Sequence, residues 1–325
     1  MQMSVAVKRK NRRRSGTERR PRRRASVCSY WCLLSWAGRG ACALIGVLAS
    51  LGGGACRGGH PPIERGGWWA QAPFAAEVTQ VDPLRLGVLV GDRAEAPTDT
   101  ATRFARDARR ARDRGAVAVV VLGDIADDAA TIEDALRSAA RAGLPVLALS
   151  GEREPLIGFR AAAAAAGALD LTLKRLVRFV SSSGSVTVAA LPGSRDPFAA
   201  PGSERFRDQD LAGVVTALSG PRRGERRLLL AHMPPRLGGD ATADRGHGGY
   251  HVGDLDVAAL LSQLPGVILI AGHVPEAVAG PSPAGVGRTV VQPGAGALVV
   301  LDRDVGVLVE SLAGPGVQPT PPAPK

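Results

Sequence analysis

Five short apolar runs in this sequence are each followed at once by an acidic residue or a histidine. Three of them end in a glycine and an acid, at Gly91-Asp92, Gly123-Asp124 and Gly151-Glu152, and two later runs end at His232 and His273. Ligands of open α/β sheets bind beyond the carboxyl ends of the strands, and a glycine there lets the backbone turn sharply. Carboxylates and imidazoles that meet at one such edge are the ligand set of a divalent metal ion.

The elements that must position these residues follow an alternating pattern. Apolar runs at residues 86–90, 116–122 and 145–149 are separated by helical segments at 98–114 and 131–142, which predicts an α/β fold with buried strands. Thr98 or Asp99 is the expected cap of the first helix. The later elements that we predict are a hairpin of 176–180 with 185–190, a helix at 208–218, strands at 227–231 and 267–271, a helix at 255–264, and closing strands at 289–292, 297–301 and 305–310.

Composition divides the chain into four parts. Residues 1–56 form a basic leader with an apolar segment, 57–83 a linker, 84–312 one globular domain, and 313–325 a proline-rich disordered tail. Lys8 to Arg24 hold eleven basic residues against one acid, so this segment supplies +10 of the net charge of +11. The folded domain is therefore close to neutral, and we expect it not to bind nucleic acid.

The positions of the four cysteines exclude disulfides and cysteine-zinc sites in the predicted domain, and the segment that holds them indicates export. All of them, at positions 28, 32, 42 and 56, precede the predicted domain. Residues 41–51 are apolar, too few to cross a bilayer but typical of the hydrophobic part of a signal peptide. Gly53-Gly54-Ala55-Cys56 then resembles a bacterial lipoprotein cleavage site, so we expect a protein of the bacterial cell envelope, held at the membrane by a lipid on Cys56 or by the signal segment. Ordinary signal-peptide cleavage, which would leave a periplasmic protein, is the alternative.

The strand-end residues resemble a family pattern in their order and spacing. Gly91-Asp92, Gly123-Asp124-Ile-Ala-Asp127, Gly151-Glu152-Arg153-Glu154, His232-Met-Pro-Pro235 and Gly272-His273 are similar to the five motifs of the calcineurin-like metallophosphoesterases. The resemblance covers about 185 residues. It implies a sandwich of two mixed β-sheets flanked by helices, with a two-metal centre at the strand ends and phosphoric esters as substrates.

Three departures from the family pattern reduce the expected metal centre. Ala94 and Pro275 occupy the positions of two metal-binding histidines, so one of the two sites keeps only Asp92 and Asp124. The other site would keep four ligands, Asp124, Glu152, His232 and His273, with Glu152 in place of an asparagine. We therefore expect one divalent ion, Mn, Fe or Zn, rather than two, and weakened activity because a single ion cannot clamp both nucleophile and leaving group.

Arg153 replaces the histidine that assists the leaving group in the family, and it leaves two alternatives open. In an active enzyme, which would use metal-activated water, its planar fork would grip the substrate phosphate, and Asp92 would be the other catalytic residue. In a metal-free protein, the same guanidinium would neutralise the carboxylates of Asp92, Asp124 and Glu152. The second alternative makes the chain a catalytically inactive pseudo-phosphoesterase that serves as an envelope binding or scaffold module.

A few further residues are weaker candidates. His247 and His251 could replace lost ligands if their loop folds over the site, and Glu95 and Glu276 lie beside the lost histidines. For these four, solvated surface positions are the simpler expectation. Asp127 is expected as a helix cap or a partner of a ligand. The expected partner is a phosphorylated small molecule or another phosphoester, while oligomeric state is left open by the sequence.

Overall fold

The computed structural model describes part of the chain, and every structural statement below concerns that part. The described residues are 74–77, 81–92, 94–173, 175–182, 184–197, 199–220, 225–238, 243–277, 280–284 and 288–313. The predicted leader, its cysteines and lipoprotein site, and residues 314–325 of the predicted tail lie outside them. None of the described helices is long and apolar enough to cross a membrane.

Strands and helices alternate along most of the chain, as the apolar runs predict. The strands are β1 (Phe74–Glu77), β2 (Leu84–Leu89), β3 (Ala118–Val121), β4 (Val146–Ala148), β5 (Leu169–Asp170), β6 (Leu176–Ser181), β7 (Gly184–Leu191), β8 (Glu225–Ala231), β9 (Ile268–Ala271), β10 (Gly280–Pro283), β11 (Thr289–Gln292), β12 (Gly296–Asp302) and β13 (Gly306–Ser311). The α-helices are α1 (Pro97–Asp113), α2 (Ala129–Ala140), α3 (Leu156–Ala166), α4 (Asp208–Leu218) and α5 (Leu255–Ser262), and η2 (His247–Gly249) is a 3₁₀ turn.

The strands form two mixed sheets. One has seven strands in the order β1-β6-β7-β8-β9-β11-β10, and the other has six in the order β13-β12-β2-β3-β4-β5. β2, β3 and β4 are parallel neighbours in the six-stranded sheet, and β7, β8 and β9 are parallel neighbours in the seven-stranded one. The carboxyl ends of each parallel set therefore lie along one edge of its sheet, which is where the sequence places the acids and histidines.

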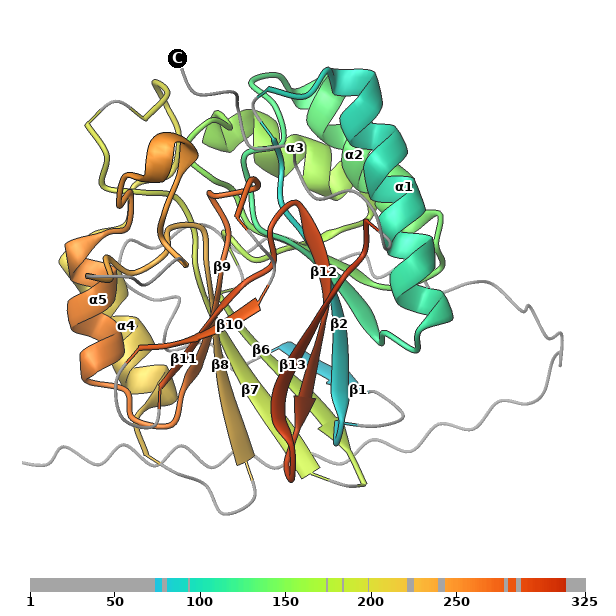
Figure 1. Ribbon diagram of the computed structural model, residues 1–325. Helices are drawn as coiled ribbons and strands as arrows, with labels where there is room; N and C mark the ends of the chain where they lie inside the picture. The colour runs from blue at the N-terminus through green and yellow to red at the C-terminus, as the bar shows by residue number, and fades with distance from the viewer. Residues whose placement is uncertain are drawn as a thin grey trace, which may run out of the picture. The chain divides into compact units, whose positions relative to one another are not determined.

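Three apolar layers hold the sheets and helices together. Between the sheets, side chains such as Leu86, Val120 and Leu230 form a common core. α1, α2 and α3 cover the outer face of the six-stranded sheet through residues such as Phe104. α4 and α5 cover the outer face of the seven-stranded sheet, so the helices flank the sheets on opposite sides (Figure 1). This is the predicted architecture, a sandwich of two mixed β-sheets flanked by helices.

The sequence predicts the ends of some helices correctly and those of others incorrectly. The helix Asp208–Leu218 has the predicted bounds, and Asp128 caps α2 by accepting a hydrogen bond from the Thr131 amide at 2.9 Å. The predicted cap of α1 is wrong, because the helix begins at Pro97 with Ala96 as its N-cap. Proline suits the first turn of a helix, since its missing N–H has no partner there in any case.

Three strands, β1, β5 and β10, were not predicted, and each lies at an edge of its sheet. β1 also lies inside the segment that we expected to be a linker. β1 pairs in parallel with β6 at one edge of the seven-stranded sheet, so this sheet begins within residues 57–83. β5 has two residues, and β10 contains two prolines, which are tolerated at sheet edges because an edge strand need not donate every N–H. Strands of two to four residues are too short to show an apolar pattern of their own, so they form through pairing with a neighbouring strand.

Candidate metal centre

Three predicted ligands from three different strands meet in one place. Asp124 follows β3, His232 follows β8 and His273 follows the turn after β9, and one ligand atom of each lies within 4.8 Å of the other two. The His232 Nε2 atom is 3.6 Å from Asp124 Oδ1, and His273 Nδ1 is 3.7 Å from Asp124 Oδ2. The two sheets therefore contribute to a single group of one carboxylate and two imidazoles.

Glu152 and Asp92 occupy different positions relative to this group. Glu152, in the turn after β4, is buried, and its Oε1 lies 3.8 Å from His273 Nδ1. Asp92, after β2, is half-buried, and its Oδ1 accepts a hydrogen bond from the Ala94 amide at 2.9 Å. Neither Glu152 nor Asp92 belongs to the compact group of Asp124, His232 and His273 that the described residues form.

The backbone is forced into the left-handed region where the ligands sit. Asp124 has φ of 59° and His273 has φ of 66°, and these are the two described non-glycine residues with positive φ. Asp and His tolerate this region better than most residues, but at a cost of about 1 to 2 kcal/mol each. The strain turns the chain sharply at the end of β3 and β9 and directs both side chains into the site.

Glycines allow the turns that carry the ligands to touch. A Cβ on Gly123 would lie 2.3 Å from the Gly151 amide nitrogen, and one on Gly151 would lie 2.7 Å from both the Asp124 amide nitrogen and His232 Cε1. Real atoms do not approach so closely, so any side chain at these two positions would push the turns apart. The glycine that precedes each acid in the sequence is therefore a packing requirement of the site.

The orientation of His232 fits a metal ligand. Its ring is fully buried, and its Nδ1 lies 2.8 Å from the Leu122 carbonyl oxygen, to which it donates a hydrogen bond. Burial lowers the pKa of this imidazole, although the charge of Asp124 opposes the shift, so the neutral form is favoured. Nε2 then carries the lone pair, faces Asp124, and has no hydrogen-bond partner among the described residues. A buried acceptor of this kind fits a bound cation.

Glu154 is a structural residue of the site that the sequence analysis did not single out. Its carboxylate is fully buried and accepts hydrogen bonds from the amides of Gly151, at 2.7 Å, and Ile125. It thus joins the turn after β3 to the turn after β4. Burial, together with the nearby charge of Asp124, raises the pKa of Glu154 to about 8. The signal for it in the sequence was its place as the last residue of the motif Gly151-Glu152-Arg153-Glu154.

Arg153 is paired with an acid outside the metal group. Its Nε donates to Asp127 Oδ1 at 2.8 Å, and the side chain of Asp127 is 72% exposed. Within the described residues, Arg153 forms no ion pair with Asp92, Asp124 or Glu152. The structure therefore does not place this guanidinium as the neutralising group of the carboxylate cluster. Asp127 is not the cap of α2, which is Asp128.

A cavity of about 330 Å³ opens beside the metal group. Its lining residues are Gly91, Asp92, Ala94, Asp124, His273, Pro275 and Glu276. Ala94 and Pro275, which stand where the resemblance leads one to expect histidines, thus form hydrocarbon parts of the wall. Glu276 is one of the lining residues, whereas Glu95 is held by Arg103 and is not among them. The space is large enough for a small ligand.

Beyond His232, the described residues of the segment between β8 and α5 supply no ligand to the metal group. His251 Nδ1 is 2.9 Å from Oδ1 of Asp244, which is fully buried, and neither residue lines the cavity. The side-chain amide of Gln292 donates to the carbonyls of Ala243 and Gly272, at 3.2 and 3.3 Å, and so ties this loop to the turn before His273. The backbone of His247 lies in η2, and its side chain is outside the described residues.

Comparisons with known proteins support the fold. The sequence matches no protein-family model, and it matches no curated protein. One solved chain, 17% identical, aligns over 71% of this chain and 99% of its own length with a TM-score of 0.51. TT1561 of Thermus thermophilus, 16% identical, aligns over the same shares with a TM-score of 0.49. Phosphopantetheinyl hydrolase (PptH) from Mycobacterium tuberculosis, 13% identical, aligns over 65% of this chain and 88% of its own, with a TM-score of 0.42.

The described residues establish the fold and bring together a group that could bind a metal. The described chain has the calcineurin-like metallophosphoesterase fold, with an Asp-His-His group at the strand ends that could bind a metal. Identities of 13 to 17% show the fold alone and carry no activity over to this chain. What the chain does must be argued from its own residues.

The first prediction concerns His232. We expect the protein, purified with Mn, Fe or Zn, to hold about one ion per chain, and His232→Ala to weaken its affinity by about 100-fold or more, since even the partner of a ligand contributes 10- to 100-fold. Elemental analysis and titration calorimetry measure both. His251→Ala is the matched control, because this histidine lies outside the cavity. Equal metal content in wild type and His232→Ala would contradict the assignment.

The second prediction concerns the two lost histidines. The double substitution Ala94→His and Pro275→His restores imidazoles to the cavity wall beside Asp92 and Asp124, so we expect the bound metal to rise from about one ion to about two per chain. Each single substitution should give less than the pair. Unchanged stoichiometry in the double variant would mean that the wall does not bring these positions close enough to share an ion.

Proposed function

We propose that this chain is an exported hydrolase of phosphoric esters that works at a single divalent metal. The observation that carries the proposal is the His232 imidazole, buried and turned so that its Nε2 lone pair meets Asp124 and His273 beside a cavity. A structural histidine in a core normally has both ring nitrogens satisfied or one in contact with water. A buried and unpartnered nitrogen at the meeting point of an acid and a second histidine favours a metal site.

The residues of the site divide the work between holding an ion and binding the substrate. Asp124, His232 and His273, with Glu152 as a fourth donor, would hold the ion. A divalent ion there would polarise a phosphoryl oxygen and lower the pKa of a water molecule. The Nε of Arg153 is engaged by Asp127, and its terminal nitrogens, which bond no described residue, remain available to a phosphate oxygen. Asp92 and Glu276 line the space next to the ion and would orient the rest of the substrate.

The lining of the cavity offers little for protonating a leaving group. His273 is the one described imidazole that lines it, and this residue belongs to the metal group, so no other histidine of the described part of the chain is placed to donate a proton. A general acid contributes about 10² to 10⁴-fold to such reactions, but only when the leaving group needs a proton.

The third prediction follows from this missing acid. We expect nitrophenyl phosphate to be hydrolysed about 10²-fold faster than an alkyl ester such as glycerol phosphate, because nitrophenolate leaves without protonation. Both rates should be lost in His232→Ala and kept in His251→Ala. Equal rates on the two esters would reveal a general acid that the structure does not show, and no metal together with no turnover would refute the hydrolase.

The alternative function is a non-catalytic binding or scaffold module of the cell envelope. Two features of the chain favour this alternative. Ala94 and Pro275, which line the cavity, stand where the resemblance implies two histidine ligands, and Arg153 stands where it implies a catalytic histidine. The absence of bound metal in the purified protein, combined with a normal fold, is the result that would select it.

Export and membrane attachment are proposals that the sequence alone supports. We propose that Cys56 carries a lipid after cleavage behind Ala55 and anchors the protein to the membrane.

The fourth prediction tests this anchor in a bacterial host. We expect Cys56→Ser to move the protein from the membrane fraction to the soluble fraction, and Cys42→Ser, in the apolar segment, to leave it in the membrane. Mass spectrometry of the mature N-terminus identifies the lipid directly. An unmodified Cys56 in membrane-bound protein would contradict the lipid anchor.

A further inference from the structure

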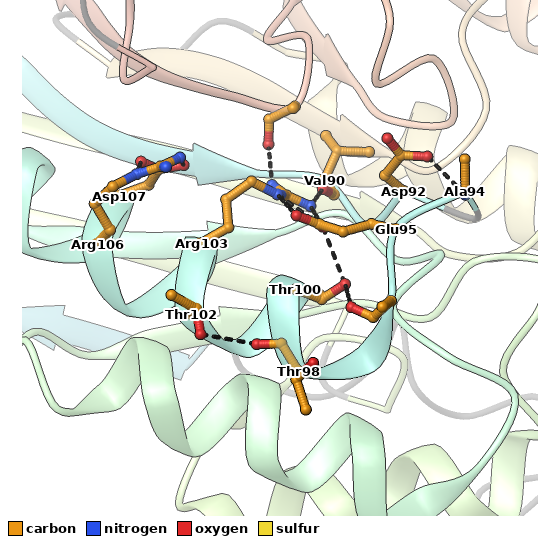
Figure 2. Close-up of polar contacts among 12 residues, drawn as sticks. Val90, Asp92, Ala94, Glu95, Thr98, Thr100, Thr102, Arg103, Arg106 and Asp107 are labelled. Carbon is orange, nitrogen blue, oxygen red and sulfur yellow. Dashed lines mark hydrogen bonds and ion pairs between the residues drawn. The ribbon is translucent and has the colours of Figure 1, made fainter.

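Arg103, on α1, fastens the turn that forms one wall of the cavity. Its Nε donates to both carboxylate oxygens of Glu95, at 2.9 and 3.1 Å, and its terminal nitrogens donate to the carbonyls of Val90, at 2.9 Å, and Ala295, at 2.8 Å. Figure 2 shows the guanidinium between Val90 and Glu95. The Arg103 side chain is only 10% exposed, so these bonds are largely shielded from solvent.

The partners of Arg103 lie on both sides of the turn. Val90 directly precedes Gly91 and Asp92, and Glu95 follows Ala94, so the guanidinium closes the segment from its two ends. The Ala295 carbonyl, which also accepts the Val90 amide at 3.1 Å, fixes this assembly to the start of β12. Gly91, Asp92 and Ala94, which line the cavity, are held between these contacts.

Additional bonds stiffen the same turn. The Thr100 hydroxyl donates to Glu95 Oε2 at 3.0 Å, so Glu95 is bound from two positions on α1. Asp92 Oδ1 accepts the Ala94 amide, which closes the tip of the turn (Figure 2). The wall is thus built before any ligand enters.

We propose that Arg103 is a positioning residue, which holds the cavity wall of Gly91, Asp92 and Ala94 in the binding geometry. In a two-metal centre this turn would be fixed by an ion bound to its own side chains, and here Ala94 offers no ligand. The fork of Arg103 provides the fixation instead, from outside the cavity. The consequence for substrate binding rests on the proposed function, whereas the fixation of the turn does not.

The geometry requires arginine and not merely a positive charge. A guanidinium presents donors in a rigid planar fork, and here it reaches one carboxylate and two carbonyls in different directions at once. A lysine ammonium at the end of a flexible chain can reach Glu95 but not all three partners. Other arginines of α1 do not share the role, since Arg106 pairs with Asp107, and Arg109 is exposed with no bond among the described residues.

The fifth prediction compares Arg103→Gln and Arg103→Lys with Arg109→Gln as the matched control on the same helix. Hydrogen exchange of the intact protein should show the amides of residues 91–96 exchanging about tenfold faster in both Arg103 variants and unchanged in the control. The amides of β3 should keep their protection in all three. Unchanged exchange at 91–96, or an equal loss of protection in β3, would overturn the inference, and Arg103→Lys decides the matter if Arg103→Gln does not fold.

Kinetics then separate this inference from the proposed function. With nitrophenyl phosphate, the Arg103 variants should raise KM about tenfold while kcat and metal affinity change less than about threefold, because the ligands of the ion lie on other strands. Turnover by wild type with unaltered KM in both variants would overturn the positioning role and leave the hydrolase standing. Absence of turnover in wild type would refute the hydrolase, and the exchange measurement would still decide whether Arg103 holds the turn.

Discussion

The candidate site depends on direct main-chain contact between the turns that follow the strands. Gly123 lies against the Gly151 amide, and a Cβ on Gly91 would lie 1.9 Å from the Asp124 carbonyl oxygen. Ligand atoms from both sheets come within 4.8 Å of one another because the chains that carry them touch. Side chains between these turns would widen the site beyond the reach of one ion, so the glycines are as necessary to it as the acids and histidines.

This close packing also brings acidic groups together in a buried volume. Glu154 accepts two main-chain hydrogen bonds that join the turns after β3 and β4, and it does so next to the charge of Asp124. The rise of its pKa to about 8 shows how strongly burial and this charge disfavour a further negative group. The neutral, buried His232 is the complementary partner, because it offers a lone pair to a cation without adding charge. The electrostatics of the site thus favour a small cation between Asp124 and the imidazoles.

The sequence predicted what depends on local pattern and on strand direction. The alternation of strands and helices and the meeting of Asp124, His232 and His273 follow from apolar runs that end in chemically active residues. The sandwich of two mixed sheets was implied by the resemblance of the motifs to those of the metallophosphoesterases. The sequence did not predict β1, β5 or β10, because edge strands of two to four residues are too short to show an apolar pattern of their own. The sequence also did not predict the direction in which side chains within the turns point. Arg153 turns to Asp127, and Glu154 turns inward, according to backbone angles that composition does not encode.

The side-chain amide of Gln292 joins two segments that are far apart in the sequence through hydrogen bonds. It bonds the carbonyl of Ala243, 49 residues earlier, and that of Gly272, 20 residues earlier, and the second of these adjoins His273. The hydrogen bond to Ala243 therefore restricts which changes of length the loop after β8 can accept. Insertions or deletions there must return the Ala243 carbonyl to the same point in space, or the neighbouring imidazole loses its support. Among relatives, length variation should accumulate in the stretch before Ala243 and spare the part that the amide grips.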